Sequence, residues 1–247
     1  MNNKKWIQEK KEGYTKRKVA LYYDKKRFSN YGGRYVDNKE KAIVTSYLKD
    51  ELSSIARGKK VSLLDVPCGT GRFAVLFSNK GFNVTAADYS QDMLDITAKR
   101  AKVKLVKCDA YNMPFKKGKF DVVVSIRFLF HYPNPENILK ELVRVTKNGG
   151  ILVFCTLNKY SVRYFIEIIL DLFRKSKEHK LKFVTEKELN EKIKNLGVKI
   201  LTTESMFVIP TQMYGKLPKF MVKFFMFIEK FTPDNLKILR YWKVSKK

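Results

Sequence analysis

Three acidic residues and one glycine-rich turn are the features of this sequence with the most specific chemistry. The turn is P-C-G-T-G at residues 67–71; Asp65 stands just before it, and Asp88 and Asp109 each follow a later apolar run. Glycines let the backbone of a turn approach a ligand closely. Ligands of open parallel sheets bind at the carboxyl ends of the strands, where these carboxylates would lie. The pattern predicts a nucleotide-binding site.

Strands and a helix must hold these residues in place. Residues 61–66 form a short apolar run, which is typical of a strand buried on both faces of a parallel sheet. Residues 72–79 follow as a helix with one apolar stripe, and Gly81 ends it. Residues 82–87 give a second buried strand that runs into Asp88. Strand, glycine turn, helix, strand and acid together predict a βαβ unit.

Two classes of cofactor use such a unit. Residues 69–74 fit the G-x-G-x-x-A fingerprint of dinucleotide-binding proteins, and Asp88 lies near the offset of about 20 residues expected of a ribose ligand. The acid inside the first strand, Asp65, is the more specific signal. With it, D-x-P-C-G-T-G resembles the first motif of the class I S-adenosylmethionine-dependent methyltransferases. An NAD-binding oxidoreductase is the alternative.

The resemblance implies roles for the residues around the turn. Asp65 and the turn, with Pro67, Gly69 and Gly71, would hold the methionine end of S-adenosylmethionine, and Asp88 would bind both ribose hydroxyls. Pro67 replaces the usual first glycine and lacks an N–H, so only its carbonyl could face the ligand. Met93 would equally suit a core position. The further cofactor contacts that the resemblance implies, all near strand ends, are Tyr89, Met93, Asp109, Ala110 and Ser125.

The stretch at residues 120–157 extends the resemblance to the small-molecule branch of the family. Three segments here are similar to the ubiquinone and menaquinone methyltransferases: F-D-V-V-V-S, H-Y and L-x-E-L-x-R-V-x-K-N-G-G-I-L-V-F. The loop S-I-R-F lacks the N/D-P-P-Y/F motif of adenine-N6 enzymes. Cytosine-C5 enzymes need a Pro-Cys pair in this loop, but the one such pair, at residues 67–68, lies in the cofactor turn. We therefore expect a small-molecule or lipid-like acceptor of the quinone or isoprenoid type, with RNA as the alternative.

Transfer of a methyl group to a neutral oxygen or nitrogen also needs a base. The chain has only two histidines, His131 and His179, and imidazole titrates near neutral pH. The resemblance puts His131 beside the methyl donor and predicts it as the base, although it could instead bond to the backbone. Arg127 could hold an anionic acceptor, and a carbon nucleophile would need neither residue. Arg34 could close over the cofactor's carboxylate or be an ordinary surface residue.

The composition limits which partners and which cellular compartment we expect. Lys and Arg number 51 against 24 Asp and Glu, a net charge of +27 that suits nucleic acid, an anionic membrane, anionic substrates or simply solubility. The three cysteines have neither metal-ligand nor disulfide-framework spacing, so we expect no metal site and a reducing cytosol. The N-terminal stretch is lysine-rich without an apolar core, and no apolar run approaches about 18 residues. The protein is expected to be cytoplasmic; its oligomeric state is left open.

The fold class predicted is α/β, a Rossmann-like sheet of seven mostly parallel strands with helices on both faces. We expect one domain: an N-terminal helical lid at residues 1–58, a cofactor-binding core at 59–157 and a C-terminal half at 158–247. Within the lid, residues 31–35 are predicted as a loop, and Asp37 as the N-cap of a helix at 37–56. Two very apolar inserted helices, 159–174 and 217–231, would form a pocket open to an anionic membrane or would pack on each other.

Overall fold

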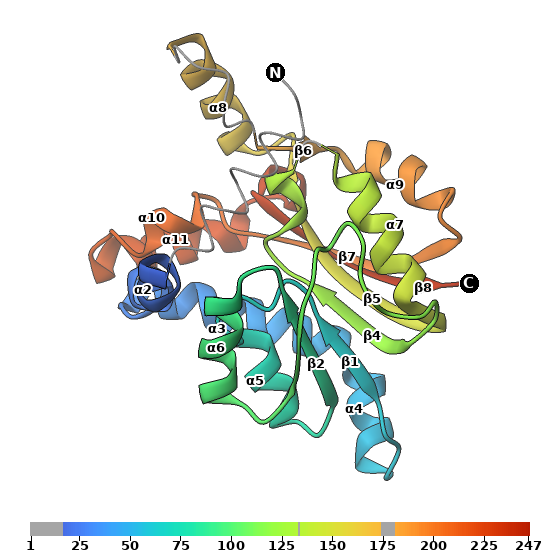
Figure 1. The fold of residues 1–247 in the computed structure, drawn as a ribbon. Coiled ribbons are helices and arrows are strands. Elements are labelled where there is room, and N and C mark those ends of the chain that lie inside the picture. Colours follow the sequence, from blue (N-terminus) through green and yellow to red (C-terminus); the bar gives the residue numbers. More distant parts are fainter. Residues whose placement is uncertain (1–16, 133, 174–180) are drawn as a thin grey trace.

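A central β-sheet organises the computed structural model, which describes residues 17–132, 134–173 and 181–247. The strand order is β3-β2-β1-β4-β5-β8-β7, and a short β6 pairs with β5 (Figure 1). All pairings are parallel except those of β8, which runs antiparallel to β5 and β7. The predicted Rossmann-like sheet is confirmed. The strands are β1 Ser62–Asp65, β2 Asn83–Asp88, β3 Lys104–Lys107, β4 Phe120–Ser125, β5 Thr146–Asn158, β6 Phe183–Val184, β7 Val198–Met206 and β8 Leu239–Lys246.

Helices cover both faces of this sheet (Figure 1). One face carries α3 (Tyr31–Tyr47), α5 (Arg72–Ser78) and α6 (Gln91–Arg100), and the other carries α7 (Pro135–Val145) and α9 (Glu186–Lys194). The sheet therefore has a separate apolar core on each side. The remaining helices are α2 Arg17–Phe28, α4 Lys49–Ala56, α8 Val162–Phe173, α10 Thr211–Tyr214 and α11 Lys219–Phe231, with 3-10 turns at Leu129–His131 and Asp234–Leu236.

Local sequence signals set several of the helix starts. The Ser90 hydroxyl accepts the Met93 N–H and caps α6. The spacing T-x-x-E at residues 185–188 predicts a capping box, and Thr185 and Glu188 form one reciprocally at the start of α9. Pro135 occupies the first turn of α7, where its missing N–H costs no hydrogen bond. These local signals fix where the three helices begin.

The N-terminal helix begins earlier than predicted. Residues 31–35 are the first turn of α3 and not a loop, because the Asn30 side chain caps the helix by accepting the Gly33 N–H. Asp37 is thus an internal helix residue and not the N-cap. Gly32 is required for close packing: a Cβ there would lie 1.9 Å from the carbonyl oxygen of Tyr214. The predicted helix 37–56 is also divided, with Leu48 between α3 and α4.

Two further boundaries differ from expectation. The apolar run at residues 151–156 predicts the fifth strand there, but β5 starts at Thr146, because an irregularity after Phe120 lets residues 147–150 join the strand. The sequence predicts a strand at residues 198–209, but β7 ends at Met206, since Phe207 adopts a positive φ of 67° and turns the chain. Among the described residues, no helix has both the length and the apolarity needed to cross a bilayer.

The contact between α3 and α10 gives a test of the fold. An alanine inside a helix is ordinarily more stable than a glycine, but we expect Gly32→Ala to lower the free energy of unfolding by about 2 kcal/mol, because the new methyl group overlaps the backbone of Tyr214. Gly215→Ala is the control, since its Cβ would meet its nearest atom at 3.4 Å; we expect a change within about 0.5 kcal/mol. Urea unfolding measures both, and a stabilising Gly32→Ala would contradict the packing described.

Candidate active site

A pocket opens at the carboxyl ends of β1, β2, β3 and β4, where the sequence places its acids and its glycine turn. Eight of the predicted site residues line it: Pro67, Asp88, Tyr89, Met93, Asp109, Ala110, Arg127 and His131. The wall also includes residues that the sequence did not single out for this site, among them Tyr23, Thr70, Arg72, Cys108, Phe128 and Tyr132. The strand-end position is the one that open α/β sheets use for ligands.

Asp88 is fixed at the centre of this pocket. Its Oδ2 accepts the Gly69 N–H at 2.8 Å and its Oδ1 accepts the Ser90 N–H at 2.9 Å. Burial raises the pKa of Asp88 although these N–H groups favour its ionised form. Each carboxylate oxygen can accept a second hydrogen bond. The Tyr89 N–H also favours the ionised carboxylate, and a carboxylate has about four lone-pair sites in all. The residue can therefore still receive a hydroxyl donor without moving, which fits the ribose of a nucleoside cofactor.

The glycine turn is shaped by its backbone conformation. Gly69 and Gly71 both lie in the left-handed region, with φ of 53° and 83°. The Thr97 hydroxyl donates to the Gly69 carbonyl at 3.1 Å, and a Cβ on Gly71 would lie 2.9 Å from the Thr97 side chain. The Cβ position of Gly69 is open space. Gly71 is therefore needed for packing against Thr97, and Gly69 is needed for its backbone conformation beside open space.

Asp65 lies behind the turn and does not itself line the pocket. It is 2% exposed, it accepts the backbone N–H of Ala74, and its Oδ2 has no hydrogen-bond partner among the described residues. Burial, reinforced by the nearby charge of Asp88, raises the pKa of Asp65 to about 8. Arg72 opposes this shift only in part, so the two neighbouring buried acids fit a cofactor that carries positive charge, as the sulfonium and amino groups of S-adenosylmethionine do.

The end of the pocket beside β3 is suited to a nucleobase ring. Asp109 follows β3, and its Oδ1 accepts the Tyr111 N–H at 3.0 Å, which fixes the carboxylate. Met93 is both core and wall, because it is 3% exposed and still lines the pocket. Burial raises the pKa of the neighbouring Cys108 thiol to about 11, so this wall presents no thiolate near neutral pH.

A buried carboxylate that the sequence analysis missed organises the end of the pocket that Arg127 and His131 line. Glu40 is 0% exposed; its Oε1 accepts Arg127 Nε at 2.7 Å and the Tyr241 hydroxyl at 2.5 Å, and its Oε2 accepts Arg72 Nη2 at 3.0 Å. The signal was present in the sequence, since Glu40 shares the apolar face of α3 with Val36 and Ile43. Arg127 is therefore held in one orientation rather than free to follow a substrate.

The first described helix, α2, adds residues that sequence reasoning also missed. Tyr23 lines the pocket, and Asp24 accepts the Thr70 hydroxyl at 2.7 Å and forms an ion pair with Arg100. These contacts tie α2 to the glycine turn and to α6. The basic and aromatic character of the segment marks it as unusual, but nothing in the sequence tells which acid reaches the turn.

Five predicted site residues do not line the pocket: Arg34, Asp65, Gly69, Gly71 and Ser125. Arg34 is exposed on α3 and donates to the Ser29 carbonyl, so the structure does not bring it to the pocket. Ser125 is fully buried at the end of β4 and is not part of the wall. His179 lies outside the described residues. His131 and Arg127 are together at the pocket, as predicted.

The comparisons with known proteins agree with this geometry. Residues 64–154 match the family model of a methyltransferase domain. A ubiquinone biosynthesis O-methyltransferase of Rickettsia canadensis is 28% identical over 183 residues, 70% of this chain and 78% of that protein. One of Thiobacillus denitrificans is 31% identical over 153 residues, 57% of this chain and 65% of that protein.

Solved structures show the same fold at low sequence identity. The magnesium protoporphyrin IX methyltransferase of Synechocystis, solved with bound SAH, superposes with a TM-score of 0.67 at 13% identity and covers 98% of this chain and 100% of its own. A SAM-dependent methyltransferase of Archaeoglobus fulgidus gives a TM-score of 0.59 at 19% identity, covering 92% and 98%.

The raised pKa of Asp65 predicts a pH dependence for the ligand-free protein. An unfolded aspartate ionises near pH 3.9, whereas the folded one ionises near 8, so folding takes up a proton between these values. The stability contributed by the protonated acid is complete below about pH 4 and is lost as the pH rises through about 8. The asparagine of Asp65→Asn does not titrate. The free energy of unfolding of this variant, relative to that of wild type, should therefore grow with rising pH by up to about 1.4 kcal/mol per pH unit across this window.

Urea unfolding between about pH 5 and pH 8 measures the difference. Asp95→Asn, on the exposed side of α6, is the matched control and should show no such trend. A stability difference between Asp65→Asn and wild type that stays constant with pH would contradict the buried, unpaired acid.

Proposed function

We propose that this chain, a class I S-adenosylmethionine-dependent methyltransferase, methylates a small molecule with a lipid-like body of the quinone or isoprenoid type. The observation that carries the proposal is an outward-facing apolar surface on two helices at the acceptor side of the pocket. The relatives named as ubiquinone biosynthesis O-methyltransferases support the same class of acceptor. The family match gives no support to the RNA or dinucleotide alternatives.

The described residues would have two tasks, which are to hold the cofactor and to accept a proton. When bound, the cofactor supplies an activated methyl group that is displaced in line, so the main task of the protein is alignment. Asp88 and Asp109 would hold the two ends of its nucleoside, and Asp65 and the glycine turn its methionine end. His131 would accept the proton of an acceptor hydroxyl as the oxygen attacks the methyl carbon.

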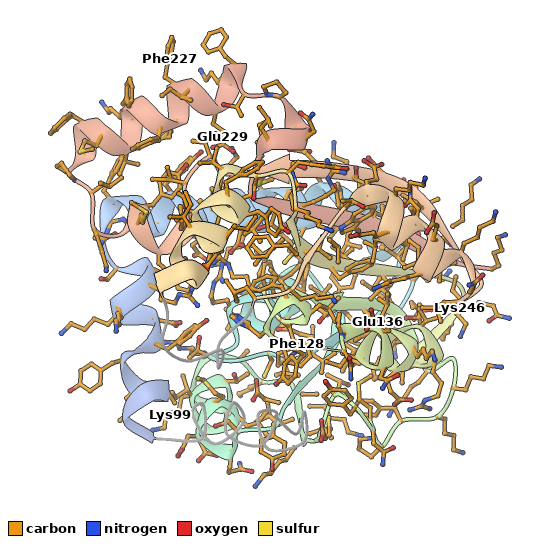
Figure 2. All side chains as sticks on the ribbon, turned by 90° about the horizontal axis from the view of Figure 1, so that it is seen from above. Lys99, Phe128, Glu136, Phe227, Glu229 and Lys246 are labelled. Carbon is orange, nitrogen blue, oxygen red and sulfur yellow. The ribbon has the colours of Figure 1, made fainter. Side chains whose placement is uncertain are left out.

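The helix α11 presents a row of aromatic side chains to solvent. Phe220, Phe224, Phe227 and Phe231 are 56% to 72% exposed, and Figure 2 shows Phe227 directed away from the body of the protein. Lysines at positions 216, 219, 223, 230 and 237 surround this row. An apolar face with a basic rim is the pattern of a helix that lies on an anionic membrane. We therefore include peripheral contact with such a membrane in the proposal.

The inner side of α11 is held to the protein by a buried acid. Glu229 is 3% exposed and points toward the body (Figure 2), where it accepts from Lys39 Nζ at 2.6 Å, Tyr35 Oη at 2.8 Å and the Phe207 N–H at 2.7 Å. This fixes which face of the helix is turned outward. The outward aromatic row therefore results from the anchoring of α11 and not from a loosely attached helix.

The helix α8 repeats the pattern beside a different edge of the site. Phe165, Ile166, Ile168 and Ile169 are exposed, and the helix projects from the body away from α11 (Figure 1). The alternative in which the two inserted helices cover each other's apolar faces is therefore wrong. Two separate apolar surfaces near the acceptor end would let a lipid-like acceptor reach the pocket from a membrane.

A methyl-transfer assay with labelled cofactor tests the proposal. The acceptors are one catechol with a short chain in solution and the same catechol with an isoprenoid tail in anionic vesicles. We expect label in the organic extract in both cases. Phe224→Asp should reduce transfer to the vesicle-borne acceptor at least about tenfold, because a charge on the aromatic row opposes insertion, while transfer to the soluble acceptor is retained.

Leu201→Asp is the matched control, since Leu201 is a similarly exposed apolar residue on β7, away from both helices. It should leave both rates unchanged. Specific incorporation of label into an RNA species, with none in the organic extract, would overturn the acceptor class. Equal transfer by Phe224→Asp and wild type from vesicles would remove the membrane contact.

A further inference from the structure

A second, smaller pocket adjoins the active site and is lined by three arginines. Arg27 of α2, Arg127 of the loop after β4 and Arg163 of α8 converge there with Thr211 of α10. Arg127 and His131 line both this pocket and the larger one, so the two spaces share a wall. Apolar side chains, including Leu157 and Leu239, form the rest of the wall. Three segments far apart in the sequence thus bring cations to one place.

The guanidinium of Arg127 has one nitrogen left to bind a ligand. The side chain is 8% exposed; its Nε donates to Glu40 Oε1 and its Nη1 to Thr211 Oγ1, each at 2.7 Å. Its buried Nη2 has no hydrogen-bond partner among the described residues. A buried donor without a partner is costly, and an ionised one is more so. Because Arg127 lines the small pocket, Nη2 is the donor of this side chain that remains for a ligand there.

Arg163 shows the same incomplete pairing. Its side chain is 15% exposed, its Nε is buried without a hydrogen-bond partner in the described ranges, and its Nη2 lies 3.8 Å from Glu167 Oε1. Burial lowers the pKa of Arg163, and although Glu167 opposes this shift, the charges of Arg127 and Arg27 add to it. Three cations that repel one another in a partly buried pocket are the arrangement that a bound anion would stabilise.

We propose that this three-arginine pocket binds a carboxylate group of the acceptor. The proposal rests on the methyltransferase function above and deepens it by assigning the acceptor class as an organic acid. A planar carboxylate matches the two-donor geometry of guanidinium groups. The free space is only about 20 Å³, so a small planar carboxylate is favoured over the bulkier, tetrahedral phosphate. A carboxylate held here would place the body of the acceptor against His131.

Calorimetric titration of the SAH-loaded protein tests this assignment. The probes are protocatechuate, the corresponding carboxamide and the corresponding phosphonate, which share one catechol ring. We expect the carboxylate to bind at least about tenfold more tightly than the carboxamide. In Arg163→Gln this preference should fall to about twofold or less, and in Arg163→Lys, which retains charge but loses the paired donors, it should be intermediate.

Lys199→Gln removes one positive charge from an exposed position on β7 and should keep the wild-type preference. If Arg163→Gln does not fold, Arg27→Gln carries the same expectation. Equal affinity for acid and amide, or no binding of either, with SAH binding intact, overturns the carboxylate site alone. Tighter binding of the phosphonate overturns it in favour of a phosphate. Failure to bind SAH overturns the methyltransferase function and this assignment with it.

Discussion

The carboxylate of Glu40 is the single interaction on which most of the active site depends. It is buried between Arg72 of α5, Arg127 of the loop after β4 and Tyr241 of β8. Burial alone would raise the pKa of Glu40, but the charges of Arg127 and Arg72 keep it below its ordinary value. A charge can be buried at tolerable cost only when its hydrogen bonds are this complete. The glutamate therefore fixes three elements relative to α3.

This arrangement links the cofactor side of the molecule to its acceptor side. Arg72 begins the helix after the glycine turn, and it also pairs with Asp37, one turn before Glu40 on α3. Arg127 lines both pockets, and its Nη2 has no hydrogen-bond partner among the described residues. The helix α3 is thus more than a cover, because it supplies the carboxylates that orient Arg72 and Arg127. The paired helices at the acceptor end, α10 and α11, are attached to the same helix through Gly32 and through Glu229.

Features that depend on neighbours in sequence were predictable, and features that depend on distant contacts were not. The turn, the strand-end acids Asp88 and Asp109 and the capping box at Thr185 follow from local patterns, and the structure has them where expected. The start of α3 was missed because Gly32 resembles a loop residue until its contact with Tyr214 is known. Glu40 was missed because its partners come from positions 72, 127 and 241. Arg34 was assigned to the pocket by resemblance alone, and the direction of its side chain is decided by tertiary contacts.

The most direct test of this account is the stability and SAH affinity of Glu40→Gln, compared with Glu191→Gln on the exposed face of α9. Removing the charge leaves Arg72 and Arg127 buried without their shared partner, so we predict a loss of about 3 kcal/mol or more in the free energy of unfolding. The double variant Glu40→Gln with Arg127→Gln should lose less than the sum of the two single changes, because they remove the same interaction. Glu191→Gln should remain within about 0.5 kcal/mol of wild type. Wild-type stability and wild-type SAH affinity in Glu40→Gln would contradict the central role given to this residue.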